Sequence, residues 1–199
     1  MHTLGITGGI GTGKTAVCRL FEALGAQVFY ADAESKRILA EDASARAEIV
    51  AAFGAESYAE DGALNRRYLA ERVFGDAEQL ARINAIVHPR VRQAFADTRA
   101  RAEANGVPLL VYEAALIYET GGEAHLDAVA VVEAPEAVRI ARVVARDGVT
   151  PEQVRARMQH QLPPATLHAR ADYHLDNSGD QAALRPQVEA LFHRLTGTR

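Results

Sequence analysis

A glycine-rich segment near the start of the chain carries the most specific chemical signal. Residues 8–15 read Gly-Gly-Ile-Gly-Thr-Gly-Lys-Thr and fit G-x-x-x-x-G-K-[ST] at every fixed position. Glycines in such a loop let backbone N–H groups converge on phosphate oxygens at a helix N-terminus, where a Cβ would leave no room. Lys14 is placed to neutralise the β and γ phosphates, and the hydroxyl of Thr15 to hold Mg²⁺. The segment therefore predicts a nucleotide site.

The elements on both sides of this loop are the ones that a phosphate loop needs. Residues 4–7 read as a short buried strand, and residues 14–24 as a helix with one apolar face. Gly25 ends that helix as a C′ residue, and residues 27–30 read as a second strand. Together they predict a β-loop-α-β unit with two parallel, right-handed strands.

Two acids follow or end predicted strands. Asp32 comes directly after the second strand, and Glu113 ends a third strand over residues 107–112. The carboxyl ends of parallel strands meet at the edge that faces the phosphate loop, so Asp32 can accept the proton of an acceptor hydroxyl and Glu113 can orient the water shell of Mg²⁺. The alternatives are that Asp32 caps a helix from Ala33 to Leu39 and that Glu113 only ends its strand.

Three arginines share one face of a predicted helix that ends at Gly148. Arg139, Arg142 and Arg146 are spaced i, i+3, i+7. A solvated face is the usual explanation for such a stripe, but beside a phosphate loop a mobile lid that carries arginines is the second interpretation.

The composition excludes several classes of protein. The 199 residues carry a formal charge of −4, which argues against nucleic acid or an anionic membrane as the main partner. No apolar run approaches the ~18 residues of a membrane span, and no leader-like segment precedes the first strand. Cys18 is the single cysteine and reads as a small buried residue, so we expect a cytoplasmic protein without disulfides.

The positions of the two lysines exclude a further class of nucleotide-binding protein. Only Lys14 and Lys36 are lysines, which leaves 20 arginines among the 22 basic residues. Neither lysine follows an asparagine, so the guanine-reading NKxD element of regulatory GTPases is absent. A small-molecule kinase is favoured.

The rest of the chain predicts an α/β core with insertions. Residues 32–105 read as mostly helical, with breaks that include Pro89, and residues 128–132 and 173–176 read as two more strands. Pro135 starts a helix, Thr150 opens another with a capping box, and Pro163-Pro164 ends it. We predict a parallel five-stranded sheet flanked by helices, with core segments at about 1–31, 106–138 and 170–199, a helical lobe at about 32–105 and a lid at about 139–169.

An ordered series of motifs resembles the dephospho-CoA kinases nearly from end to end. The loop alone occurs in many families, but the series is specific. Its elements are Gly8–Thr15, Tyr30-Ala31-Asp32, Leu64-Asn65-Arg66, Val73-Phe74, His88-Pro89, Ala115–Glu119, Arg142–Gly148, Gln161, Ala171-Asp172-Tyr173 and Asn177-Ser178-Gly179.

The resemblance implies a P-loop NTPase-type fold and ATP-dependent phosphorylation of the ribose 3′-hydroxyl of dephospho-CoA, with Mg²⁺ as cofactor. It implies Asp32, Lys14 and Arg142 as catalytic residues and Thr15 as the metal ligand. Carried over by position, the ATP-binding residues are Gly9, Gly11, Thr12, Gly13, Lys14, Thr15, Ala16, Arg142, Arg146 and Asn177. The acceptor-binding residues are Asp32, Arg66, His88 and Glu119. The oligomeric state stays open.

Two segments depart from the family pattern. Asn65 stands where the family usually has an aspartate, and Ala115 where it usually has a proline. His88 has the alternative of an imidazole packed at a helix-start turn. A kinase for another small alcohol and a nucleotide-dependent binding module are the rival functions.

Overall fold

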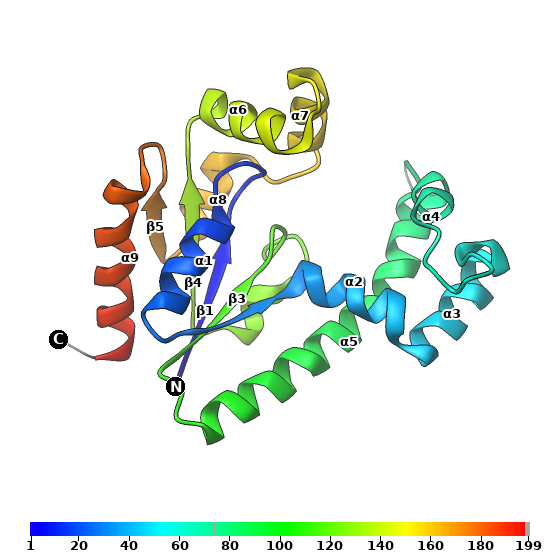
Figure 1. The fold of residues 1–199 in the computed structure, drawn as a ribbon, viewed down its shortest axis with the longest axis horizontal. Helices are drawn as coiled ribbons and strands as arrows, with labels where there is room; N and C mark the ends of the chain where they lie inside the picture. The colour runs from blue at the N-terminus through cyan, green and yellow to red at the C-terminus, as the bar shows by residue number, and fades with distance from the viewer. Residues whose placement is uncertain (74, 198–199) are drawn as a thin grey trace. The chain divides into compact units, whose positions relative to one another are not determined.

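A parallel sheet of five strands organises the core of the molecule (Figure 1). The computed structural model describes residues 1–73 and 75–197, so Phe74 of the Val73-Phe74 motif lies outside the described residues. The strands are β1 (His2–Thr7), β2 (Gln27–Tyr30), β3 (Leu109–Glu113), β4 (Ala128–Glu133) and β5 (Tyr173–Asp176). Their order is β2-β3-β1-β4-β5, and every neighbouring pair is parallel. The predicted five-stranded parallel sheet is confirmed.

Helices cover the sheet and connect its strands. Those of the sheet-bearing unit are α1 (Lys14–Ala23), α6 (Glu136–Asp147), α7 (Pro151–Met158), α8 (Pro164–Arg170) and α9 (Gln181–Thr196), with a 3₁₀ turn η2 at Gly122–His125. Within the described ranges, no helix has both the length and the apolar stretch that crossing a bilayer takes.

The main core lies between one face of the sheet and the helices α1 and α9. Alternate strand residues such as Leu4, Ile6 and Leu175 are at most 2% exposed and pack against Phe21 of α1 and Val188 of α9. This pattern follows from the two-residue period of a strand, which sends Leu4 and Ile6 to the same face. The core holds β1 rigidly in the middle of the sheet, at the strand that leads into the glycine loop.

Residues Ala31–Arg99 form a second compact unit, which is helical. Its elements are α2 (Ala31–Glu41), α3 (Ala43–Phe53), a 3₁₀ turn η1 (Ala55–Ser57), α4 (Arg66–Val73) and most of α5 (Ala77–Ala104). Ile38, Ile49 and Leu69 are buried. The Tyr58 hydroxyl donates a 2.8 Å hydrogen bond to the carbonyl of Leu39, which ties η1 to α2.

Three local predictions were wrong. The helix after β2 begins at Ala31, so Asp32 lies in its first turn and is not its N-cap. Pro89 does not break or start a helix, because α5 runs through it, as a long helix can when it gives up a backbone hydrogen bond. The helix that Thr150 caps ends at Met158, and Pro164 then starts α8 instead of ending a helix.

Candidate functional site

The glycine loop takes a backbone path that excludes side chains at several positions, of which Gly11 and Gly13 are examples. Gly11 and Gly13 have φ angles of 80° and 94°, in the left-handed region that favours glycine. A Cβ on Gly11 would overlap the carbonyl oxygen of Arg139, and a Cβ on Gly13 would overlap Nδ2 of Asn177. The two glycines therefore serve both the turn and the close packing of the loop against its neighbours.

Side chains of the loop itself hold its shape. The buried Thr12 hydroxyl donates a 2.9 Å hydrogen bond to the carbonyl of Gly9, and the Thr12 N–H donates to the same oxygen at 3.2 Å. The Lys14 ammonium donates a 2.9 Å bond to the carbonyl of Gly8, across the loop. These bonds curl residues 8–14 around the N-terminus of α1.

The N-terminus of α1 is suited to an anion. Gly13 is the N-cap and offers no side chain, and the first turn contains no acidic residue. The exposed N–H groups and the helix dipole then favour a phosphate at this end. Lys14, the predicted phosphate-binding lysine, and Thr15, the predicted Mg²⁺ ligand, both lie in this first turn, and Thr15 is exposed.

Arg139 reaches the loop from α6 although it belongs to the stripe that resembles a solvated face. It is 7% exposed, and its Nε donates a 2.9 Å hydrogen bond to the carbonyl of Ile10. Its guanidinium also lies where a Cβ on Gly9 would be. Burial lowers the pKa of Arg139, and within the described part of the chain no carboxylate lies within 4 Å of this guanidinium. The solvated-face alternative is therefore wrong for Arg139, which the lid interpretation included in its stripe but which is not among the predicted ATP-binding residues.

Arg142 and Asn177 converge on another carbonyl of the loop. Asn177 is 6% exposed, and its Nδ2 donates a 2.7 Å bond to the carbonyl of Thr12. Arg142 donates longer bonds, of 3.5 Å to the same carbonyl and 3.4 Å to that of Gly179. Asn177 is a fixed support of the loop, whereas Arg142 is held weakly enough to turn toward a ligand.

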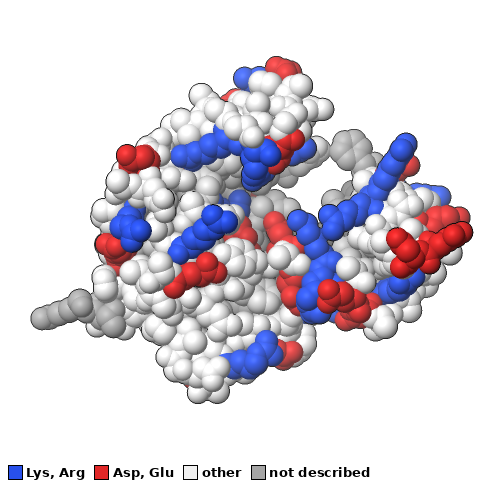
Figure 2. All heavy atoms as spheres, viewed as in Figure 1, with Lys and Arg blue, Asp and Glu red and all other residues white. Residues whose placement is uncertain are grey.

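Arg146 lies at the other end of α6 in a different setting. Its side chain is 65% exposed and pairs with Asp147 at 2.7 Å, and Arg157 of α7 pairs with the same carboxylate at 3.1 Å. The two guanidinium groups lower the pKa of Asp147 by hydrogen bonding. Asp147 thus joins α6 to α7 through Arg157, and Arg146 holds that carboxylate from the α6 side. Figure 2 shows Lys and Arg side chains gathered where α6 and α7 lie over the loop.

The segment between α7 and α8 also contacts the loop. Gln161 accepts a 2.8 Å hydrogen bond from the N–H of Ile10 through Oε1. Glu119, a predicted acceptor-binding residue, accepts a 3.0 Å bond from the N–H of Leu162. Gln161 is in the motif series but was not assigned to the site, because a side-chain amide carries no chemical signature until its partner is known.

The buried carboxylate of Glu113 lies at the end of β3 beside the start of the loop. Glu113 is 8% exposed and pairs with Ile6 in the register of β1 and β3, one residue before Thr7 leads into the loop. A carboxylate here and the Thr15 hydroxyl are hard oxygen donors, the kind that Mg²⁺ prefers. The donor set therefore fits a magnesium ion held with phosphate oxygens and water.

Known proteins of one family match this chain almost completely. The family model for dephospho-CoA kinase matches residues 2–183. A dephospho-CoA kinase of Salinibacter ruber is 56% identical over 99% of both chains, and one of Anaeromyxobacter dehalogenans is 43% identical over 100% of this chain and 94% of its own. The chain belongs to the dephospho-CoA kinase family. A crystal structure of a Thermus thermophilus protein has 36% identity, covers 98% of each chain and superposes with a TM-score of 0.85.

Within the dephospho-CoA kinase family, the departure at Asn65 has a local explanation. Asn65 Oδ1 accepts a 3.1 Å hydrogen bond from the N–H of Tyr68, which makes Asn65 the N-cap of α4. Asparagine and aspartate cap helices about equally well. The substitution therefore preserves the start of α4 and leaves the neighbouring Arg66 exposed in its first turn.

The other predicted residues of the helical unit lie on α2 and α5. Asp32 is exposed, two residues after the end of β2, in the first turn of α2. His88 is half-buried in α5, and burial together with the nearby Arg92 lowers its pKa. Cys18 is buried, as predicted, and burial raises the pKa of its thiol.

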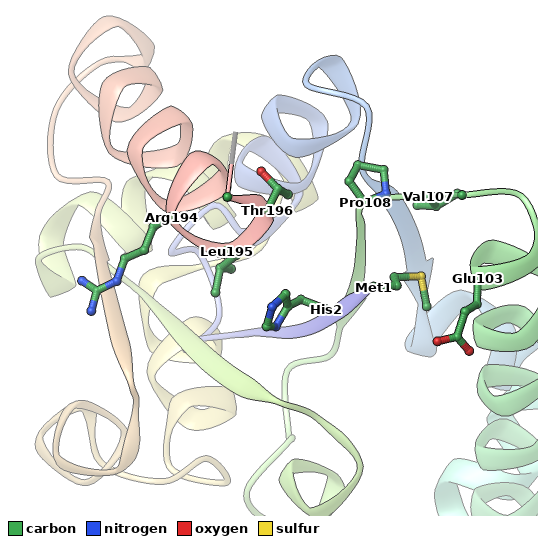
Figure 3. A pocket seen from close by; sticks show the side chains of 10 residues that line it. Met1, His2, Glu103, Val107, Pro108, Arg194, Leu195 and Thr196 are labelled. Atoms are coloured by element: carbon green, nitrogen blue, oxygen red, sulfur yellow. The ribbon is translucent and has the colours of Figure 1, made fainter. Parts of the chain in front are cut away.

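A separate hollow of about 550 Å³ opens at the far end of β1 (Figure 3). Met1, His2, Glu103 and Arg194 are among its lining residues. Because β1 enters the sheet at His2 and reaches the glycine loop only after Thr7, this hollow lies at the opposite end of the strand from the phosphate loop. It is not part of the predicted nucleotide site.

Proposed function

We propose that this member of the dephospho-CoA kinase family transfers the γ-phosphoryl group of ATP to the ribose 3′-hydroxyl of dephospho-CoA, giving CoA and ADP. The observation that carries the proposal is a complete phosphate loop in a chain that matches dephospho-CoA kinases from end to end. The single cysteine is a buried thiol, which suits the reducing cytoplasm where we place the reaction.

The ATP side of the site is built from the loop and from α6. Residues 11–16 surround the phosphates, with backbone N–H groups such as those of Gly11, Gly13 and Thr15 as donors, and Lys14 moves from the carbonyl of Gly8 to the β and γ phosphates. Arg142 can leave its two long bonds to contact the transferred group, where a cation stabilises charge in the transition state. Gly9 and Asn177 shape the loop, and we also place Asn177 near the adenine.

Mg²⁺ is the expected cofactor, with Thr15 as its protein ligand and Glu113 close to its water shell. When bound, Mg²⁺ neutralises charge on the β and γ phosphates and holds them in line for transfer. The chain's own contribution is a hydroxyl in the first turn of α1 and a buried carboxylate at the end of β3.

We assign the acceptor to the helical lobe at about 32–105 and closure over ATP to a lid at about 139–169 that includes Arg146. Asp32 accepts the proton of the 3′-hydroxyl as its oxygen bonds to the γ phosphorus, while the bond from that phosphorus to ADP breaks. Arg66, His88 and Glu119 bind the acceptor. A neutral His88, favoured by its lowered pKa, can both donate and accept a hydrogen bond.

The first experiment measures ADP release with a panel of acceptors. Dephospho-CoA should stimulate release far above the rate with water, and mass spectrometry should find CoA as the product. Adenosine, nucleoside monophosphates and shikimate serve as competing acceptors. Preference for one of these would assign a different small-alcohol kinase, and tight ATP binding without stimulation by any acceptor would assign a binding module.

The second experiment separates the proton acceptor from the nucleotide site. Asp32→Asn should lower kcat by about 10²-fold or more and leave ATP affinity nearly unchanged. Lys14→Arg, which keeps the charge but changes its shape, should lower both ATP affinity and kcat. The matched control is Glu34→Gln, which removes a carboxylate two residues further along α2 that pairs with Arg37, and it should keep the full rate. An Asp32→Asn enzyme with the original kcat would remove Asp32 from the mechanism.

A further inference from the structure

Two histidines and a glutamate meet beside the end of β4, on residues that the proposed reaction does not use. His168 Nδ1 lies 3.0 Å from Glu133 Oε1, and His174 Nδ1 lies 3.7 Å from Glu133 Oε2. The two imidazole rings stack with centroids 4.0 Å apart and an angle of 31° between them. We propose that Glu133, His168 and His174 bind a divalent transition-metal ion of the Zn²⁺ class.

Three different elements of the sheet-bearing unit present these side chains. Glu133 is the last residue of β4, and His174 pairs with Val131 in the parallel register of β4 and β5. Glu133 and Val131 are two residues apart and therefore share one face of the sheet with His174. His168 comes from α8, which packs on β4 through the buried Leu167. The cluster is thus carried by regular elements and not by a loose loop.

The distances fit the coordination that zinc prefers. Bonds of about 2.0–2.1 Å to nitrogen and oxygen place tetrahedral ligands about 3.3 Å from one another. The Nδ1–O distances of 3.0 and 3.7 Å lie on both sides of that value, and one ligand atom from each residue lies within 4.8 Å of the others. Small side-chain rotations would close the set around one ion.

The chemistry of the three side chains favours a soft or borderline cation over Mg²⁺. Neutral imidazole suits Zn²⁺, Cu²⁺ and Ni²⁺, whereas Mg²⁺ takes oxygen ligands. The side chains of His168, His174 and Glu133 are 57%, 39% and 34% exposed, so water can occupy the remaining position. Without an ion, His168 is hydrogen-bonded to Glu133 and its ring lies against that of His174, so the experiment must distinguish a metal site from this ion-free arrangement.

A bound ion would connect α8 to the strand end that supports the glycine loop. The carbonyl of Glu133 accepts a 2.8 Å hydrogen bond from the N–H of Asn177, whose side chain holds the carbonyl of Thr12. An ion that binds the folded state alone stabilises it in proportion to the logarithm of its concentration. We therefore expect metal binding to raise the melting temperature, whether or not the proposed phosphoryl transfer is correct.

The test is a Zn²⁺ titration of full-length protein that carries no histidine tag and has been freed of metal by a chelator. Calorimetry and competition with a chromophoric chelator should show one site per chain, and excess Mg²⁺ should not displace the ion. Co²⁺ should give the visible absorption bands of a coordinated ion. The melting temperature should rise with Zn²⁺ concentration.

Variants connect that site to the three residues. His168→Ala, His174→Ala and Glu133→Gln should each lower Zn²⁺ affinity by more than the ~10–100-fold that loss of an outer-shell partner costs. His125→Ala removes an exposed histidine outside the cluster and should bind like the parent. Circular dichroism and melting without metal check that each variant folds, and His168→Gln provides a second variant at the same position.

Two results would overturn the proposal. One is a parent protein that shows no stoichiometric Zn²⁺ or Co²⁺ site. The other is a set of folded cluster variants that bind as tightly as His125→Ala. Either result would leave Glu133 and His168 as a hydrogen-bonded pair with His174 beside it.

Discussion

The two ends of α6 carry the same residue type on one stripe and have opposite surroundings. At the first end, Arg139 is buried against the glycine loop and Arg142 bonds to two loop-side carbonyls. At the last turn, Arg146 is 65% exposed and paired with Asp147, which also binds Arg157 of α7. The apolar residues between them, Ile140 and Val143, pack with Ile10 and Val154.

The difference teaches that helical spacing sets only which side chains share a face. The role of each arginine depends on its partner, which can be a backbone carbonyl, a carboxylate or water. The hydrogen bond from Arg139 to the carbonyl of Ile10 offsets part of the cost of burying its charge, and an anion bound at the loop would offset more. The first end of α6 is therefore suited to function, and the last turn to joining two helices.

The largest effect should come from Arg142, the arginine of α6 that contacts the loop through long hydrogen bonds and can turn from them toward a ligand. Arg142→Ala should lower kcat/KM by about 10²-fold or more, because a cation that contacts the transferred group is lost. Arg142→Lys should recover only part of the rate, since an ammonium lacks the planar fork. Steady-state kinetics with both substrates give the values, and an unchanged kcat would reduce Arg142 to a surface residue.

Arg139 should separate function from stability. Arg139→Met should raise the KM for ATP by about 10-fold, while the free energy of unfolding stays the same or increases, because a buried charge is replaced by an apolar chain of similar length. Urea unfolding and ATP titration measure the two quantities. A marked loss of stability with unchanged ATP binding would make Arg139 a structural residue, like the apolar side chains beside it.

A substitution of Asn177 tests how the glycine loop is supported, and it does so without a change of charge. Asn177→Ala should lower the free energy of unfolding by about 1–2 kcal/mol, because the carbonyl of Thr12 loses a buried 2.7 Å hydrogen bond. Ser178→Ala is the matched control, since that hydroxyl donates its hydrogen bond to the exposed Asp176. Equal stabilities for the two variants would contradict a supporting role for Asn177.

The smallest effect belongs to the last turn of α6. Hydrogen bonds from Arg146 and Arg157 lower the pKa of Asp147 in the folded state, so its contribution to stability is full above its unfolded pKa of about 4 and is lost as the pH falls through the lowered value. Asp147→Asn should therefore be slightly less stable than the parent at neutral pH and equal to it in strong acid. Melting temperatures at a series of pH values show this, and kcat should not change.

Local patterns in the sequence were sufficient to predict strand bounds, helix caps and helix ends, which depend on neighbouring residues. β2 and β5 have the predicted bounds, and Thr150 forms the predicted capping box with Gln153. Gly25 and Gly148 follow their helices with φ angles of 95° and 66°. These features depend on residues within one or two helical turns, so spacing and residue type contain the needed information.

Prediction failed where a long-range contact overrides a local preference. A proline at position 89 favours a break, yet α5 continues because its packing stabilises the helix on both sides. The burial of Arg139 was not readable because it depends on Ile10, 129 positions earlier in the chain. The cluster of Glu133, His168 and His174 could not be predicted for the same reason, because its three residues come from separate elements and do not follow a regular spacing in the sequence.

The sequence by itself determined the phosphate loop, the strand that precedes it, the helix that follows it and, through the ordered motifs, the family. These depend on residue types at short, fixed spacings. Only the tertiary structure decided that β1 lies between β3 and β4, that Asn177 and Arg139 hold the loop, and that Glu133 meets two histidines. Such contacts form between side chains far apart in sequence, and their geometry exists only after the sheet has brought the strand ends together.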